Sequence, residues 1–391
     1  MRIAHLADAH LGFRQFQRLD ADGLNQREAD VAAAFRRAMD AVIARAPDAV
    51  VIAGDLFHAV RPTNRSIIEA FTQLSRLRQE LPAAPVVLIA GNHDTPRSSE
   101  AGSILKLMSS LGVDVVDEGT KRLHYPDLDL SVLAVPHADL LRGTRNWLPD
   151  GRARHNILVM HPEIIGYFPE AGESDYGGVQ VDANELGAEW RYVALGHYHI
   201  STEVIPHAWY SGSLEYTSPN IWGEWRVEQD RRTSKGILMA DLEAGTVERV
   251  PLPPLRVVHD LPWLDALGMT AADLDAAIQG RIAGISGGVA NTVTRLVVLN
   301  VPRPLAHALD HASLRGLKAA ALHFHLDLRR PEVKGRIVGM GAPGTRLPLP
   351  EIVAQYLARR PLDADLDRSR LIALGRDYID QVDRDVAEAG A

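Results

Sequence analysis

The sequence predicts an α/β fold with a layered first domain, a small α+β cap and a helical tail. Through the first half of the chain, apolar runs of strand length alternate with helix-like stretches, as in layered α/β proteins. After Tyr210 the pattern changes to shorter strands and turns, and two breaks rich in proline or glycine follow. At 391 residues the chain is longer than one ordinary domain, so we expect two or three units.

The first domain, predicted at residues 1–250, has three expected helices between its strands. They cover residues 27–46, 64–81 and 99–111. In the first of them, apolar side chains recur at helical spacing at Val31, Phe35, Met39, Val42 and Ile43. Thr63 or Asn64 is the expected N-cap of the second helix, and Gly112 is expected to end the third. Further strands are expected over residues 130–135 and around Val159 and Val193.

A hairpin is expected to close the first domain, and a stiff break follows it. The hairpin strands cover residues 236–242 and 246–250, and the break contains Pro251, Pro253 and Pro254. The α+β cap is predicted at residues 256–338, where Thr270 and Asp273 have the spacing of a capping box that opens a helix. The other expected cap elements are a strand over 294–301, a helix over 310–322 and a strand over 323–328.

A linker rich in glycine and proline, residues 339–350, leads to a helical tail predicted at 350–391. Apolar residues of the tail fall on one helical stripe at Leu371, Leu374, Tyr378, Val382 and Val386. Two interpretations stand side by side. The stripe packs on its own chain, or it docks a partner protein.

The composition limits the kind of partner. The net charge is −8, whereas a free-standing nucleic-acid binder is usually basic, so overall charge does not supply affinity for nucleic acid. A nucleic-acid substrate remains compatible with this charge, because bound cations offset acidic ligands locally. Four arginines are expected in loops beside the site described below, where they bind phosphate or are simply solvated. They are Arg14, Arg61, Arg65 and Arg97.

The chain has no cysteine, which excludes disulfides and thiolate metal sites and favours a reducing cytoplasm. The N-terminus enters an apolar strand almost at once, so no signal peptide is expected. No apolar run approaches the length that crosses a bilayer. We therefore expect a soluble cytoplasmic protein without a membrane partner.

Five strand-like runs end in side chains that bind metal ions. These side chains are Asp8, His10, Asp55, Asn92, His161, His197 and His199. Ligands in open sheets gather where strands end, so the five ends are expected to converge at one edge. Oxygen and nitrogen donors without thiolates suit a pair of hydrolytic divalent cations. The sequence therefore predicts a two-metal site for phosphoester hydrolysis.

The spacing of the ligands suggests how they share two ions. Asp8 and His10 are two residues apart, so in extended backbone both side chains point the same way and grip one ion. His197 and His199 have the same spacing, but two different ions are an alternative for them. Asp55 has two carboxylate oxygens and is expected to bridge the ions. The neutral Asn92 keeps the net charge low enough for an anionic substrate to approach.

Next to Asn92 lie two further candidates. Two ions about 3.5–4 Å apart polarise phosphoryl oxygens and activate a bridging water. The side chain of His93 diverges from that of Asn92, so it is expected to stabilise developing charge or to protonate the leaving oxygen. Asp94 is expected to hold that imidazole in orientation.

Three other histidines are expected to be structural. His323 and His325 have the spacing of a ligand pair, but they open a predicted strand and no acidic motif accompanies them. His137 follows a strand, but no further ligand is missing for it to supply.

The motif series Asp-x-His, Gly-Asp, Gly-Asn-His-Asp, His and Gly-His-x-His resembles the calcineurin-like metallophosphoesterase superfamily. Further segments resemble its SbcD branch, the nuclease subunits of DNA double-strand-break processing complexes. These segments are 8–12, 54–58 with Pro62, 196–199 and 210–216. The resemblance covers the first 250 residues well and the rest loosely.

The resemblance implies a β-sandwich flanked by helices, with two divalent ions, usually manganese. It assigns Asp8, His10, Asp55 and His199 to one ion. It assigns Asp55, Asn92, His161 and His197 to the other. His93 has the catalytic role, and His58 lies near the scissile phosphate, with loop packing as the alternative for His58.

The resemblance also implies partners. The family pairs with SbcC, an ABC-type ATPase with a long coiled coil, through elements beyond the nuclease domain. It tends to form homodimers through helices of that domain, and residues 27–46 and 64–81 are candidates unless their apolar faces are core.

The expected function is a metal-dependent DNA exonuclease and endonuclease that acts at DNA ends or hairpins in repair or a related defence role. One alternative is a small-substrate phosphoesterase that hydrolyses phosphomonoesters or cyclic nucleotides, since the superfamily shares the metal site. The other is a non-catalytic scaffold subunit whose site is vestigial.

Overall fold

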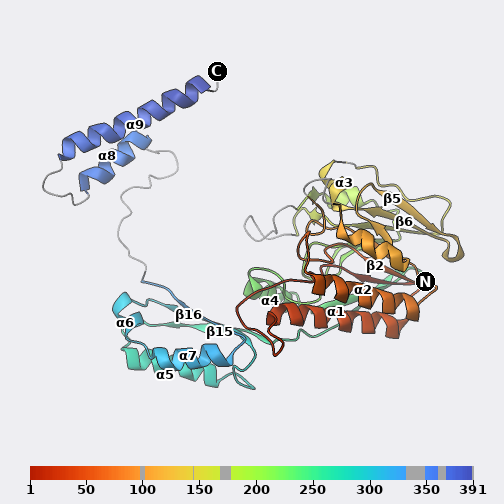
Figure 1. Ribbon diagram of the computed structural model, residues 1–391, viewed down its shortest axis with the longest axis horizontal. Coiled ribbons are helices and arrows are strands. Elements are labelled where there is room, and N and C mark those ends of the chain that lie inside the picture. The colour runs from red at the N-terminus through yellow and green to blue at the C-terminus, as the bar shows by residue number, and fades with distance from the viewer. Residues whose placement is uncertain (97–101, 144, 168–177, 332–347, 360–366, 390–391) are drawn as a thin grey trace. The chain divides into compact units, whose positions relative to one another are not determined.

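The computed structural model (Figure 1) describes residues 1–96, 102–143, 145–167, 178–331, 348–359 and 367–389. The side chains of residues 380–389 are also outside this description. The chain forms two compact units, Met1–Arg330 and Pro331–Ala391.

A six-stranded sheet in the first unit carries three of the five predicted ligand-bearing strand ends. Its strands are β1 (Arg2–Leu6), β2 (Ala49–Ile52), β3 (Val86–Ile89), β4 (Asp114–Val116), β13 (Gly236–Asp241) and β14 (Thr246–Pro251). The order is β14-β13-β1-β2-β3-β4, and β1 to β4 are parallel. The predicted closing hairpin is β13 and β14, which pairs antiparallel to β1.

A second six-stranded sheet carries the other two ligand-bearing ends, on β7 and β10. Its strands are β5 (Lys121–Tyr125), β6 (Leu130–Val135), β7 (His155–Met160), β10 (Tyr192–Leu195), β11 (Thr202–Ile205) and β12 (Ala208–Tyr210). The order is β11-β12-β10-β7-β6-β5, with β6, β7, β10 and β12 parallel. The short strands β8 (Glu163–Ile164) and β9 (Gln180–Val181) pair separately.

The two sheets pack face to face, which confirms the expected sandwich. Side chains alternate across a strand, so Ile3 of β1 points into the core between the sheets, whereas Ala4 and Leu6 face the helical layer. Val51 of β2 and Val159 of β7 lie in the same inter-sheet core as Ile3.

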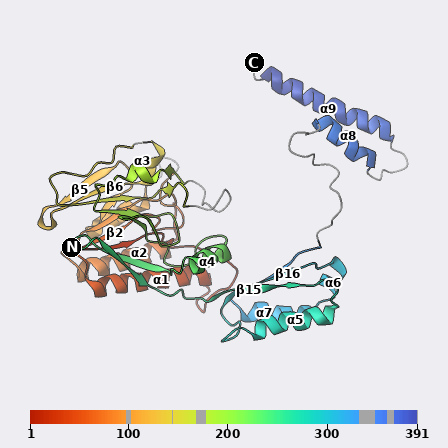
Figure 2. The same ribbon diagram turned by 180° about the vertical axis from the view of Figure 1, so that it is seen from behind.

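Two long helices, α1 (Gln26–Arg45) and α2 (Asn64–Glu80), cover the other face of the first sheet (Figures 1 and 2). Asn25 caps α1 by accepting hydrogen bonds from two backbone N–H groups, and Thr63 caps α2. The apolar stripe predicted for α1 is buried against this sheet and is therefore core.

Two elements of the first domain differ from the prediction. The helix expected over 99–111 is a 3₁₀ helix, η2 (Ile104–Leu111), capped by Ser103 and ended by Gly112. Residues 97–101 lie outside the described residues. The turns expected after Tyr210 include a helix, α4 (Ile221–Asp230), whose interior Gly223 and aromatic residues weaken its local signal.

The segment predicted as the cap contains a separate parallel sheet of β15 (Val258–Asp265), β16 (Val293–Leu299) and β17 (His323–Leu328). Its helices are α5 (Ala271–Ala283), α6 (Arg303–His307) and α7 (His311–Ala320). The capping box of Thr270 and Asp273 is confirmed. β15 was not predicted, because Pro262 falls inside it at a register irregularity.

Several contacts join the cap to the first domain. Phe16 stacks on His323 with ring centroids 3.9 Å apart. Arg256 pairs with Asp30 at 2.8 Å, and Arg18 donates to the carbonyl of Ala319 at 2.7 Å.

The second unit contains α8 (Leu349–Arg359) and α9 (Arg368–Ala389), which pack together. The residues of the predicted stripe all lie on the single helix α9. Leu371 is half-buried, whereas Leu374 and Tyr378 are exposed, because α9 approaches α8 through the face of Gly375. Val382 and Val386 lie among the side chains that are not described. Within the described residues, none of the helices is long and apolar enough to span a membrane.

Candidate metal centre

The loops that follow β1, β2, β3, β7 and β10 bring all seven predicted ligands together. Six of them fall into two of the three groups found among the described residues, each group with ligand atoms within 4.8 Å of one another. The first contains Asp8, His10 and His199, and the second contains Asp55, His161 and His197. The predicted convergence is confirmed, although the strand ends belong to two packed sheets instead of one open sheet.

Asp55 lies between the two groups, as a bridging ligand must. Its Oδ2 atom is 3.2 Å from His161 Nε2 and 3.8 Å from His10 Nε2. In the first group, His10 Nε2 and His199 Nε2 point at each other from 3.0 Å. One carboxylate oxygen therefore faces ring nitrogens of both groups.

Asn92 completes the second group. Its Oδ1 atom is 3.1 Å from His161 Nε2 and 3.0 Å from His197 Nδ1. His161 Nδ1 lies 2.7 Å from the carbonyl of Ala53, which can only accept a hydrogen bond. Nδ1 therefore carries a hydrogen, and Nε2 is the ring atom that faces the site and would bind an ion.

The backbone of the ligands is unusual. Asp8, His10, Asp55 and His197 have φ angles of 52°, 48°, 52° and 96°, in the left-handed region that non-glycine residues rarely adopt. The extended conformation expected for Asp8 and His10 is therefore wrong, although the two side chains do share one group. The direction in which these side chains point toward the site is therefore set by left-handed backbone turns after the strands, and not by the alternation of side chains along a strand.

Two glycines allow the strand ends to approach closely. A Cβ atom on Gly91 would lie 2.1 Å from Asp55 Oδ1, and one on Gly196 would lie 2.5 Å from His161 Nδ1. This packing explains why glycine precedes Asn92 and His197 in the motifs.

The ligands are buried and strongly coupled. Burial by itself would raise the pKa of Asp55, but the charge of His161 and its hydrogen bond hold that pKa well below its usual value. Burial would lower the pKa of His161, but Asp55 and then Asp8 raise it to about 9. Burial raises the pKa of Asp8. Clustered carboxylates and imidazoles of this kind fit cations that neutralise the carboxylates.

A trio of histidines lies beside the first group. Ligand atoms of His10, His58 and His93 lie within 4.8 Å of one another, and the rings of His58 and His93 stack at 5.1 Å between centroids. His93 Nδ1 is 2.7 Å from the carbonyl of His58. The backbone N–H of His93 donates to Asp55 at 2.9 Å.

Asp94 has a different role from the expected one. Its carboxylate accepts hydrogen bonds from the backbone N–H groups of Leu56, Phe57 and Gly91 at 3.1, 3.0 and 3.3 Å. The His93 ring is instead held by the His58 carbonyl. The expectation that Asp94 orients His93 is therefore corrected, and Asp94 joins the loops after β2 and β3.

Comparison with known proteins agrees with this geometry. The profile of the calcineurin-like phosphoesterases matches residues 1–201, a segment that ends just after His199. The chain belongs to the calcineurin-like phosphoesterase family. Members of this family bind divalent metal ions, and the oxygen and nitrogen donors of the two groups fit such ions.

Three similar proteins share one name. The chain is 26% identical over 317 residues to the DNA double-strand break repair protein Mre11 of Sulfolobus acidocaldarius, which covers 78% of this chain and 74% of the relative. It is 25% identical over 256 residues to Mre11 of Methanococcus maripaludis, a match that covers 62% of this chain and 63% of the relative. It is 31% identical over 219 residues to Mre11 of Archaeoglobus fulgidus, a match that covers 51% of this chain and 46% of the relative.

Two buried glutamates support the phosphoesterase site, and the sequence analysis missed both. Glu163 Oε1 is 3.2 Å from His197 Nε2, and Glu224 Oε2 is 3.8 Å from His199 Nδ1. Burial would raise the pKa of Glu224, but the charge of Lys235 and contact with His199 lower it to about 2. Carboxylates behind ligating histidines hold the ring orientation. Glu163 stands two residues after His161, and this proximity is the one local signal in the sequence that could have identified it. Glu224 lies far from any motif.

The four candidate phosphate-binding arginines have different surroundings. Arg14 pairs with Glu28 at 2.7 Å, and Arg61 and Arg65 are exposed. Arg97 lies outside the described residues.

The three histidines expected to be structural lie outside the metal-binding groups of the described residues. His137 is buried, and burial lowers its pKa to about 4. His323 and His325 are ring neighbours at the contact between the cap and the first domain.

Proposed function

We propose that this phosphoesterase is a manganese-dependent DNA nuclease of the SbcD type, acting in the cytoplasm on DNA ends or hairpins. The observation that carries the proposal is the joint placement of two ligand groups, a carboxylate between them and the adjacent His93. The relatives named for DNA double-strand break repair support a DNA substrate. The aligned part spans 63%, 74% and 62% of the first three of these relatives.

Each residue of the site has a task in this proposal. Asp8, His10, Asp55 and His199 would hold one ion. Asp55, Asn92, His161 and His197 would hold the other. When bound, two divalent ions polarise the phosphoryl group and lower the pKa of an attacking water.

His93 supplies the proton for the leaving oxygen. The carbonyl of His58 accepts from Nδ1 of the His93 ring, so Nδ1 carries a hydrogen and the transferable proton is held on Nε2 of the imidazolium. The His58 ring lies beside both His10 and His93, with 3.4 Å between His58 Nδ1 and His10 Nδ1, which favours contact with the scissile phosphate over simple loop packing. Arg61 and Arg65, both exposed, would bind the flanking phosphates.

Substitution of His93 tests the proposal. The wild-type protein with Mn²⁺ is expected to cut linear DNA, and His93→Ala is expected to lose about 10²- to 10⁴-fold in rate, because a positioned acid is removed. Calorimetric Mn²⁺ binding should persist in the variant, since His93 is not assigned to either ion. Wild-type protein that cuts no DNA with Mn²⁺, while the variant behaves identically, contradicts the nuclease.

The same assay separates the alternatives. An aryl phosphate or a cyclic nucleotide hydrolysed in preference to linear DNA would indicate the small-substrate phosphoesterase. Folded protein that binds no Mn²⁺ would indicate the scaffold subunit.

We further propose three functional segments: a nuclease domain at 1–250, a DNA-binding cap at 256–338 and a docking tail at 350–391 for an SbcC-like coiled-coil ATPase. Exposed Tyr356, Leu374 and Tyr378 on the tail helices support docking. Hydrogen exchange that slows in the tail when the ATPase is added supports this assignment, and unchanged exchange opposes it.

A homodimer through α2 is also proposed. Ile68 on this helix is 64% exposed, whereas the stripe of α1 is buried as core. Sedimentation of wild-type protein and Ile68→Glu is the test, with the variant expected to shift toward monomer.

A further inference from the structure

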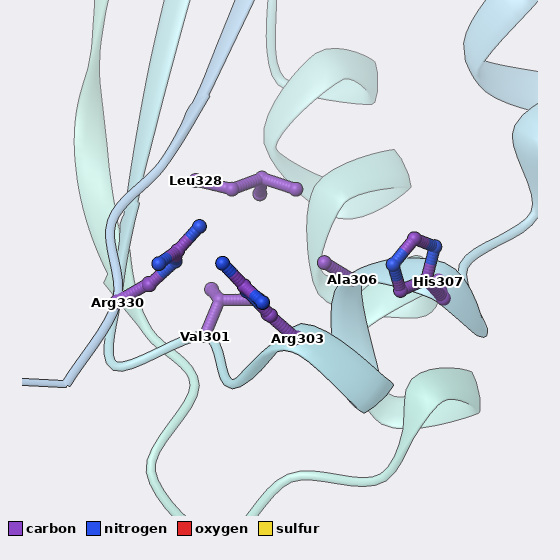
Figure 3. Close-up of a pocket in the computed structure, with 6 residues that line it drawn as sticks. All are labelled: Val301, Arg303, Ala306, His307, Leu328 and Arg330. Carbon is purple, nitrogen blue, oxygen red and sulfur yellow. The ribbon is translucent and has the colours of Figure 1, made fainter. Parts of the chain in front are cut away.

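A cavity of about 400 Å³ lies at one edge of the cap sheet, apart from the metal centre (Figure 3). It is lined by Val301, Arg303, Ala306, His307, Leu328 and Arg330. Figure 3 shows the side chains of Arg303 and Arg330 extending toward one another beside Val301 and Leu328. Its walls therefore combine two guanidinium groups with an apolar surface.

The parallel cap strands build this cavity. β16 and β17 are adjacent and parallel, so their C-terminal ends lie side by side. The backbone N–H of Val301 donates to the carbonyl of Arg329 at 2.9 Å and fixes the two exits together. Arg303, at the start of α6, follows the end of β16, and Arg330 follows the end of β17. Carboxyl ends of parallel strands are where ligands bind in open α/β sheets.

The charges at this cavity lack acidic partners. Within the described part of the chain, no carboxylate lies within ion-pair distance of Arg303 or Arg330, and both are exposed. Other cap arginines are paired: Arg329 with Asp327 at 2.9 Å and Arg295 with Asp260 at 2.8 Å. Two like charges repel each other, and an anion between them removes that repulsion. Paired guanidiniums match the oxygens of a phosphate group.

We propose that this cavity binds a phosphate group, and that in the working protein the phosphate belongs to a DNA backbone held by the cap. The inference rests on the proposed nuclease function for the source of the phosphate. The chemistry of the cavity itself specifies a phosphate ligand, so free phosphate is the other possible source.

Binding without cleavage is the experiment. The full-length protein is titrated with a fluorescent DNA duplex in EDTA over a series of salt concentrations. The double variant Arg303→Gln/Arg330→Gln is expected to bind about tenfold more weakly, with a salt slope reduced by about one for each arginine that no longer neutralises a DNA phosphate. The matched control is Arg329→Gln, which removes a neighbouring arginine that is already paired with Asp327.

Inorganic phosphate binding, followed by calorimetry, is the second arm. Loss of phosphate binding in the double variant with unchanged DNA binding supports the cavity and identifies free phosphate as the ligand. Double-variant and control proteins that match the wild type in both arms overturn the inference. Hydrolysis of a small aryl phosphodiester should be the same in all three proteins, because the metal centre is unaltered. Failure of DNA cleavage in the wild type would refute the nuclease but leave the phosphate measurement decisive for the cavity.

Discussion

At the scale of single residues, Asp94 shows how a buried carboxylate holds together the loops that follow β2 and β3. Its carboxylate accepts hydrogen bonds from backbone N–H groups in the loop after β2 and in the loop after β3. Asp55 and Asn92 stand on these same loops. The positions of two predicted ligands therefore depend on a residue that is not a member of either group.

Replacement of Asp94 by alanine is expected to lower the free energy of unfolding by at least about 3 kcal/mol. Three buried N–H groups lose their acceptor, and each unsatisfied group costs roughly 1–3 kcal/mol. Urea unfolding followed by circular dichroism measures the change. Asp22→Ala, which removes an exposed carboxylate, is the control and should stay within about 0.5 kcal/mol of the wild type. A loss for Asp94→Ala no larger than that of the control contradicts the assigned role.

At the scale of elements, β17 joins the cap to the loop that follows β1. Its first residue, His323, stacks on Phe16 with an interplanar angle of 9°. Burial, and then the charges of His325 and Lys318, lower the pKa of His323 to about 4. The neutral ring is therefore the form that this contact favours.

Acid is expected to weaken this contact. In the unfolded chain a histidine titrates near 6.5, so between pH 6.5 and 4 the unfolded state binds more protons than the folded state. The stabilisation is complete above pH 6.5 and is lost as the pH falls through this window. At pH 5 the loss is about 1 kcal/mol, a figure that allows for solvent screening of a half-exposed group.

His323→Phe is the variant that tests this pH effect, since it keeps the stacked ring and cannot titrate. Thermal unfolding at pH 7.5 and pH 5 is compared between the variant and the wild type. The variant should lose less stability on acidification. Equal losses in the two proteins would show that His323 is not the group responsible.

At the scale of the whole molecule, the metal centre joins the two sheets of the sandwich. Its ligands come from loops of both sheets, and Asp8 and Asp55 are buried there. Bound cations offset these buried negative charges, so ion binding and folding of the first unit are coupled.

Metal removal is therefore expected to destabilise the protein. Mn²⁺ at one hundred times its dissociation constant should add about 2.7 kcal/mol for each site, and EDTA should remove this gain. Differential scanning calorimetry with and without Mn²⁺ measures it. Asp55→Asn, which weakens the carboxylate between the groups, should lose most of the Mn²⁺-dependent shift. A shift of the same size in that variant would contradict the bridging position.

Much of the site was predictable because its signals are local. A strand followed by Asp, Asn or His, with glycine before it, can be recognised from a few neighbouring residues, and all seven candidate ligands do meet. The supporting contacts were not predictable in this way. Glu224 reaches His199 from α4, and Asp94 bonds to N–H groups more than thirty residues away in sequence at Leu56 and Phe57. Such pairings depend on how elements pack.

The amino-acid sequence alone determined the layered α/β class, the set of candidate ligands and the family resemblance, because periodicity and motif spacing are properties of neighbouring residues. The tertiary structure decided that the ligands come from two packed sheets and that left-handed turns at Asp8 and His10 aim them. It also decided that Arg303 and Arg330 share one cavity. The physical reason is that strand exits distant in the chain become neighbours through sheet pairing and packing, which no local pattern records.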